Sequence, residues 1–186
     1  MPKIYSGVPN LPAVNQIQSD AERTQFAAQV STTLDALKEY KSNNKTRKKE
    51  LFRQTDTLLC SARELFFDAR ENLPLRDDAR RALLALRVAV KDINSIELHA
   101  IYPDLNSDIV ICEKMILRQV EAKLDSPGIH PQGERELLQY VENIVGSTQT
   151  SENRELGLRI LKKHAPEVPI PPGVAANNKA RKRQRE

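Results

Sequence analysis

The sequence TRKKELFRQTDTLLCSARELFFDAREN, residues 46–72, indicates the fold class most directly. Its apolar side chains recur every seven residues in two adjacent rows, Leu51, Leu58 and Leu65 beside Phe52, Leu59 and Phe66. This spacing is typical of an amphipathic helix, whereas a half-buried strand would alternate every two residues. The apolar stripe is broad, so both of its sides need partners, and the helix has to pack within a bundle.

The rest of the chain repeats this helical spacing between its prolines. Helical periodicity breaks at Pro74, Pro103, Pro127 and Pro131, as expected because proline lacks an amide donor and disfavours helix in the residue before it. We expect further helices over 20–40, 76–101, 107–124, 132–146 and 151–164, with caps at Ser19 or Asp20, Asp77, Ser107 or Asp108, and Ser151. The sequence therefore predicts an all-α fold, a single bundle of five to six helices with 76–101 at its centre.

The two ends of the chain differ from the middle in proline content. Seven of the eleven prolines lie in the end segments, which predicts extended tails. We therefore expect an extended N-terminal arm (1–18), a helical bundle domain (19–164), a Pro-rich linker (165–178) and a basic tail (179–186).

Residues 20–72 leave two shapes open. A seven-residue step runs through Leu37, Asn44 and Leu51, so one continuous helix of about 80 Å, dimerising to cover its stripe, is one alternative. The nine residues 41–49 contain no apolar side chain, however, and would interrupt such a seam. This interruption favours a helical hairpin.

The charge of the chain is concentrated at its C-terminal end. There are 29 basic and 25 acidic residues, and the last eight, KARKRQRE, contain five basic residues and one acidic residue. The preceding residues therefore hold 24 of each sign, so the excess of +4 lies in the tail. A neutral body gives no general reason to expect a nucleic-acid-binding face, whereas a short cationic tail can bind phosphates, acidic lipids or an import receptor.

The tail is the most specific functional signal in the sequence. Its basic side chains are Lys179, Arg181, Lys182, Arg183 and Arg185. A proline-rich spacer is extended and would hold these cations away from the bundle. The run resembles a monopartite nuclear import signal, so these residues are candidates for nuclear import or nucleic-acid contact.

Two further basic groups lie inside the helical region. A secondary basic patch comprises Lys41, Lys45, Arg47, Lys48 and Lys49, for which a solvated helix end or hairpin loop is the favoured interpretation. The second group shares one side of the helix over 76–101, namely Arg76, Arg80, Arg87 and Lys91. We expect that side to be solvent-exposed, with Asp77 pairing to Arg81 four residues later.

Residue patterns for catalysis or metal binding do not emerge. We expect Cys60 and Cys112 to be buried reduced thiols, because both lie inside apolar helical patterns. The histidines His99, His130 and His164 have no second ligand three or four residues away, and the six glycines form no phosphate-binding loop. Helix capping explains the Asp77–Asp78 pair better than acid–base chemistry does. We therefore predict no enzyme activity, metal, cofactor or small-molecule substrate.

The sequence supports one expectation about location and two hypotheses about function, which come from different classes of protein. No run of 18 apolar residues or signal-peptide core occurs, so we expect a nuclear or cytoplasmic protein that is not secreted and acts on no membrane. The first hypothesis is a non-enzymatic helical adaptor or assembly module that binds a protein partner, or itself, through apolar helix faces. Its basic tail would serve nuclear import or contact nucleic acid.

The alternative is a self-assembling viral capsid or nucleocapsid-type protein whose tail packages nucleic acid. A helical domain followed by a Pro-rich hinge and a cationic tail is similar in layout to hepadnavirus-type core proteins. Those proteins have tryptophan-rich assembly helices and a much longer Arg-rich tail, whereas this chain has no tryptophan.

Overall fold

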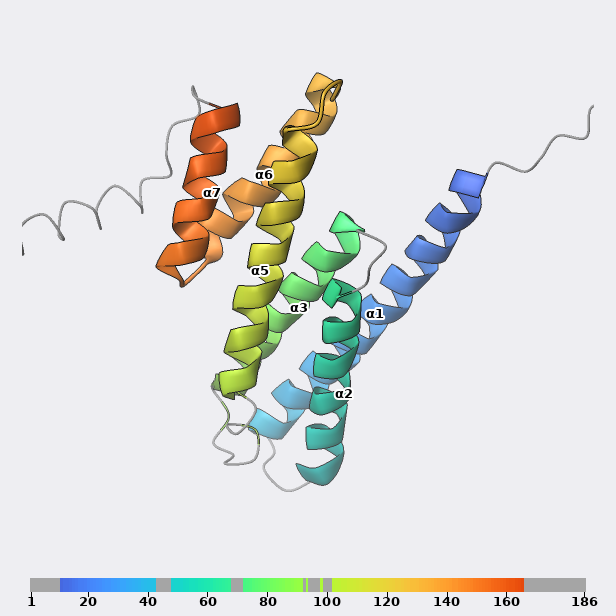
Figure 1. Ribbon diagram of the computed structural model, residues 1–186. Coiled ribbons are helices and arrows are strands. Elements are labelled where there is room, and N and C mark those ends of the chain that lie inside the picture. Colours follow the sequence, from blue (N-terminus) through green and yellow to red (C-terminus); the bar gives the residue numbers. More distant parts are fainter. Residues whose placement is uncertain are drawn as a thin grey trace, which may run out of the picture.

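Six helices and no strands make up the part of the chain that the computed structural model describes, residues 11–42, 48–67, 72–91, 93, 98 and 102–165 (Figure 1). The helices are α1 (Leu11–Ser42), α2 (Lys48–Phe67), α3 (Leu73–Lys91), α5 (Tyr102–Leu124), α6 (Pro131–Ser147) and α7 (Ser151–His164). The all-α expectation is confirmed, and the bounds of α7 coincide with those expected from the sequence.

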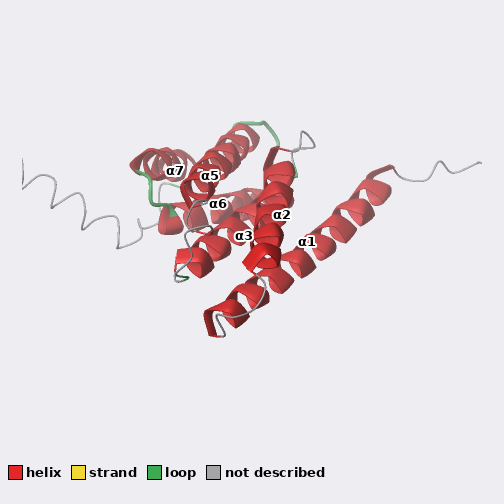
Figure 2. Ribbon diagram, turned by 90° about the horizontal axis from the view of Figure 1, so that it is seen from below, coloured by secondary structure: helices red, strands yellow, loops and turns green. Residues whose placement is uncertain are grey.

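Helix α3 lies at the centre, as its apolar pattern predicted. It packs against α1 and α2 on the N-terminal side and against α5 on the C-terminal side, while α6 and α7 pack on α5 and on each other (Figures 1 and 2). The largest fully buried side chains include Phe66, Leu83, Leu86, Leu117, Ile144 and Ile160. Because these come from both halves, one apolar core joins the six helices.

The hairpin interpretation of residues 20–72 is confirmed. Helix α1 ends at Ser42 and α2 begins at Lys48, and the two helices pack side by side. The amide of Gln29 donates a hydrogen bond of 3.2 Å to the hydroxyl of Ser61 across this contact. Asn44, around which the continuous helix was considered, lies outside the described residues.

Prolines begin helices in this protein, which corrects three expected boundaries. Pro12, Pro74 and Pro103 are the second residues of α1, α3 and α5, and Pro131 is the first residue of α6. A proline is tolerated in the first turn because the amide it lacks has no partner inside the helix there. The expected extended arm over 1–18 is therefore wrong for residues 11–18, which are helical.

Asn72, not Asp77, caps α3, and α3 is shorter than expected. The backbone N–H of Leu75 donates to Asn72 Oδ1 at 3.1 Å, and the helix begins at Leu73 and ends at Lys91. The expected helix continued to residue 101, but the chain leaves the helix after Lys91, where Ile93 N–H turns back to donate to Val90 O at 3.1 Å.

Helices α5 and α7 run parallel, with α6 returning the chain between them. Lys114 pairs with Glu152, Arg159 with Glu121 and Lys163 with Asp125, and each pair is separated by 38 residues in sequence. The α5–α6 connection turns at Gly128, whose φ of 87° favours glycine. At Gly157 of α7, an added Cβ would lie 2.5 Å from Val145 Cγ2, so α7 approaches α6 closely.

The two cysteines have opposite environments. Cys112 is buried, and burial raises the pKa of its thiol to about 12. Cys60 is exposed, which corrects the expectation of two buried thiols. The reason is helical geometry, because Cys60 lies two positions from both Leu58 and Ala62 and so points away from their buried side. None of the described helices is long and apolar enough to cross a membrane.

Candidate functional site

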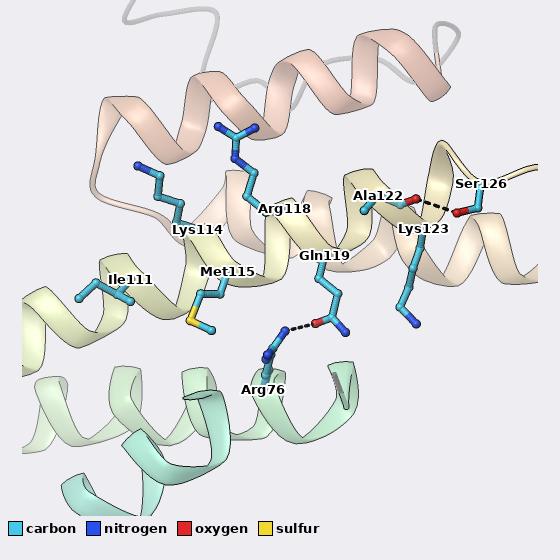
Figure 3. A pocket seen from close by; sticks show the side chains of 9 residues that line it. All are labelled: Arg76, Ile111, Lys114, Met115, Arg118, Gln119, Ala122, Lys123 and Ser126. Carbon is cyan, nitrogen blue, oxygen red and sulfur yellow. Dashed lines mark hydrogen bonds between the residues drawn. The ribbon is translucent and has the colours of Figure 1, made fainter. Parts of the chain in front are cut away.

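A groove of about 600 Å³ runs along α5 (Figure 3). We call it the α5 groove, and its lining residues are Arg76, Ile111, Lys114, Met115, Arg118, Gln119, Ala122, Lys123 and Ser126. All but Arg76 belong to α5 or the turn after it, and they recur every three or four residues. At 1.5 Å per residue, the α5 positions 111 to 123 form a wall about 18 Å long.

The middle of the α5 groove is apolar and open to solvent. Ile111, Met115 and Ala122 supply this strip, and Ile111 is 38% exposed although it is a large aliphatic residue. Phe67 in the last turn of α2, outside the groove lining, is 58% exposed. Contiguous apolar surface rimmed by polar groups is typical of interaction sites. Met115 is also a flexible side chain that can adapt to different partners.

Basic side chains flank the apolar strip on both sides. Lys114 and Arg118 point toward α7, whereas Lys123 points toward the side of α3 and Arg76 (Figure 3). No carboxylate is among the lining residues, so the lining carries four positive charges. Lys114 also reaches Glu152 of α7 at 2.6 Å, and this contact lowers the pKa of Glu152 through a hydrogen bond from the lysine.

Arg76 connects the α5 groove to the core. Its side chain is largely buried, its Nε donates to Phe66 O at 3.1 Å, and its Nη1 donates to Gln119 Oε1 at 2.6 Å. The guanidinium thus lies at the C-terminal end of α2, where helix carbonyls attract a cation. It joins α2, α3 and α5 at the base of the groove.

The expected solvent-exposed face of α3 is wrong for Arg76 and Arg80, which are both buried. Arg80 donates to Asp77 Oδ1 at 3.0 Å and to Ser147 Oγ at 3.0 Å. Asp77 is buried as well and also receives Arg81 at 2.7 Å, the i,i+4 pair that was expected. The arginines are buried because each reaches a carboxylate, carbonyl or hydroxyl partner from the inner side of α3.

The carboxylates of Asp77 and Asp78 form ion pairs with arginines and do not cap α3. Asp77 pairs with Arg80 and Arg81 within α3, and Asp78 receives Arg23 of α1 at 2.6 Å. The hydrogen bond to Asp78 raises the pKa of Arg23. Because α3 begins at Leu73, both carboxylates lie in its second turn, beyond the position of an N-cap.

A second groove lies between α1 and α3, with a volume of about 790 Å³. It is lined by Asp20, Arg23, Thr24, Phe26, Ala27, Val30, Ser31, Leu34, Asp78, Arg81, Ala82 and Ala85. Its four charged residues are two acids and two bases, and Arg23 and Asp78 neutralise each other across it. This groove therefore has no excess charge of one sign, in contrast to the α5 groove.

The candidate residues predicted from the sequence fall mostly outside these grooves. Lys179, Arg181, Lys182, Arg183 and Arg185 lie outside the described residues, as do Lys45 and Arg47. Lys41 lies in the last turn of α1 and Lys49 in the first turn of α2, and both are exposed, in agreement with a solvated helix end. Lys48 is in the first turn of α2.

Two of the histidines lie at helix ends. His130 caps α6 by accepting the N–H of Gln132 at its Nδ1, at 3.2 Å, and His164 ends α7 with Nε2 3.0 Å from Asp125. His99 lies outside the described residues. Over the ranges that the structure describes, no three His, Cys, Asp or Glu side chains gather as a metal site.

Sequence reasoning missed the α5 groove, although a signal for it was present. Helix α5 has apolar residues on more than one side, and the buried pattern through Ile109, Cys112 and Ile116 leaves Ile111 and Met115 unexplained.

Comparison of the chain with models of known protein families, with curated proteins and with solved structures gives no match.

Proposed function

We propose that this protein is a non-enzymatic helical adaptor that binds a protein partner along the α5 groove. The observation that carries the proposal is the open apolar strip of Ile111, Met115 and Ala122, which has basic side chains along both of its sides. Covering exposed apolar surface favours association, and charged flanks add specificity and orientation. The basic tail would then serve the location of the adaptor and not the recognition of its partner.

A pair of matched variants tests the groove. Ile111→Glu with Met115→Glu places two carboxylates in the apolar strip, and Ala27→Glu with Ser31→Glu adds the same charge to exposed positions of the second groove. Both full-length variants and the wild type are compared by cross-linking and quantitative mass spectrometry, after circular dichroism has shown equal helix content. We expect one set of cross-linked proteins to disappear with the α5 variant only. The same set recovered from both variants would contradict the proposal.

The tail has its own test. Replacing Arg181, Lys182 and Arg183 with alanine should abolish nuclear accumulation of the full chain fused to a fluorescent protein, since a monopartite import signal depends on such a cluster. An unchanged distribution would reject the import role. Replacing the separate basic residues Lys38, Lys41 and Lys49 with alanine is the control, and it should leave the distribution unchanged.

Sizing by light scattering separates the adaptor from capsid-type assembly. An adaptor gives monomers or small oligomers, whereas a capsid protein gives megadalton particles. Particles that retain nucleic acid and are lost when the tail cations are removed would overturn the adaptor proposal.

A further inference from the structure

The chemistry of the α5 groove narrows the class of partner, given the proposed function on which this step rests. We infer that the groove receives an acidic amphipathic helix, with an apolar stripe that covers Ile111, Met115 and Ala122 and carboxylates on both sides of that stripe.

The shape of the groove favours a helix over an extended peptide. Its wall is one side of a helix over about 18 Å, which matches roughly three turns of a second helix packed alongside. A helix satisfies its own backbone hydrogen bonds and can therefore cover an apolar strip. The described residues contain no strand and so offer no sheet edge to an extended peptide, and the groove lining has no aromatic side chain to hold a polyproline segment.

The charge of the groove favours carboxylates on the partner. Lys114 and Arg118 lie along one flank and Lys123 and Arg76 along the other, with no acid among the lining residues (Figure 3). An acidic residue at either edge of the docked stripe would thus meet a cation, whereas a basic residue would meet a like charge. Complementary flanks of this kind raise association rates and suppress wrong partners.

The ion pairs already present at the rim offer little resistance to exchange. The side chain of Lys114 is 45% exposed and that of its partner Glu152 is 69% exposed, while Arg118 reaches Glu121 at 3.3 Å from a largely exposed position. Exposed pairs contribute little because water screens them. A partner carboxylate can therefore replace or share these contacts at small cost.

Three labelled peptides of about 16 residues test the inference by fluorescence anisotropy with the full-length protein. The acidic peptide carries leucines at helical spacing i, i+4, i+7 and i+11 flanked by glutamates, and the neutral peptide has glutamines in place of the glutamates. The scrambled peptide has the composition of the acidic one without the stripe. We expect the acidic peptide to bind roughly tenfold or more tightly than the neutral one, which corresponds to about 1.4 kcal/mol.

Charge-reversed variants assign the binding to the groove. Lys114→Glu with Lys123→Glu should weaken the acidic peptide about tenfold and spare the neutral one, since only the acidic peptide meets these cations. The matched control, Lys38→Glu with Lys49→Glu, makes the same change in net charge on exposed positions of α1 and α2 and should have little effect. The scrambled peptide should bind only through the C-terminal cations and be released by the Arg181, Lys182 and Arg183 alanine variant.

The other outcomes overturn the inference in distinguishable ways. Equal affinity of the acidic and neutral peptides, both lost with Ile111→Glu, would refute the acidic partner but leave groove docking intact. Acidic binding that is lost only with the tail variant would assign it to the tail. No binding of either patterned peptide would refute a helical occupant. Displacement of the labelled acidic peptide by a short single-stranded oligonucleotide, at a lower concentration than the unlabelled acidic peptide needs, would indicate a phosphate-binding surface. Whether a protein partner binds in the α5 groove at all is tested separately, by the cross-linking comparison.

Discussion

The two sides of α5 meet very different surroundings. Toward α7, Leu117 is fully buried, Gly157 allows close approach, and the lysines and arginines at the edge meet carboxylates at a constant register of 38 residues. Toward the α5 groove, Ile111 is 38% exposed and the lining has four bases without an acid. One side is covered by α7, whereas the other side has exposed apolar surface beside bases, of which Lys114 and Arg118 already pair with Glu152 and Glu121 at the rim.

The largest expected effect comes from truncating one apolar residue on each side. Leu117→Ala should lower the free energy of unfolding by about 2–5 kcal/mol, because it removes buried contacts and leaves a cavity. Ile111→Ala should change it by about 0.5 kcal/mol or less, since that side chain is partly in water already. Urea unfolding followed by circular dichroism measures both. Equal losses would mean that Ile111 is buried in solution and that the groove is closed.

The side of α5 that faces α7 also holds a buried carboxyl group, and its replacement should lower the free energy of unfolding. Glu113 Oε2 accepts the hydroxyl of Thr148 at 2.5 Å and the amide of Asn153 at 3.2 Å, and Glu113 Oε1 and Asn153 Oδ1 have no hydrogen-bond donor within the described ranges. Glu113→Ala removes the acceptor of the Thr148 hydroxyl and one of the two acceptors of Asn153 Nδ2, which keeps its hydrogen bond to Val110 O, and should cost about 1–3 kcal/mol.

Glu113→Gln sharpens this prediction. The amide oxygen can still accept from Thr148 and Asn153, and the NH₂ group takes the position of Oε1. We expect the glutamine variant to be more stable than the alanine variant in thermal unfolding followed by circular dichroism. A glutamine variant as unstable as the alanine variant would show that the negative charge itself holds this cluster together.

Close packing of α7 predicts opposite signs for two glycine substitutions. At Gly157 an added Cβ meets the buried Val145 at 2.5 Å, so Gly157→Ala should cost about 1–2 kcal/mol even after the gain in helix propensity. Gly146 in α6 has nothing within 4 Å of its added Cβ, and Gly146→Ala should be neutral or stabilising by up to about 1 kcal/mol. Chemical unfolding of both variants is the measurement, and stabilisation by both would show that α7 is loosely packed.

The smallest effect concerns pH and the ion pairs between α5 and α7. Hydrogen bonds from Lys163 and Lys114 lower the pKa of Asp125 and of Glu152 below their ordinary values of 3.8 and 4.5. Since the folded pKa lies below the unfolded one, this stability is present above those ordinary values and is lost as the pH falls through the lowered ones.

Lys114→Ala with Lys163→Ala should therefore reduce the acid-dependent drop in melting temperature below pH 4.5. Lys162→Ala, which removes an exposed cation from the same helix end, is the control and should keep the wild-type profile. Identical profiles for the double variant and the wild type would show that these pairs contribute nothing measurable in solution.

The sequence predicts the helices better than it predicts their ends or their charged contacts. Apolar spacing located all six helices because burial of one stripe is a local property of the pattern. Three starts were placed too late because proline was treated as a break, although its missing amide also suits a first turn. Helix α3 was also expected to continue to residue 101, whereas it ends at Lys91.

The site was less predictable than the fold. Burial of Arg76 and Arg80 depends on partners such as Phe66 O and Ser147, which are distant in sequence and come close only in the folded chain. The α5 groove has the same origin, since the pattern shows that Ile111 and Met115 are apolar but not that no neighbour covers them. Both features are products of helix packing, which the apolar pattern of one sequence does not specify.

The contrast between the two thiols allows thiol labelling to measure how often the helical bundle opens. A thiol-reactive dye attacks the thiolate, so Cys60 should label at once, while Cys112, with its pKa near 12 and no exposed surface, reacts only when the bundle opens. The slow labelling step then counts opening events under native conditions. For a chain without tryptophan fluorescence, this reports on the core at the centre of α5 without any engineered probe.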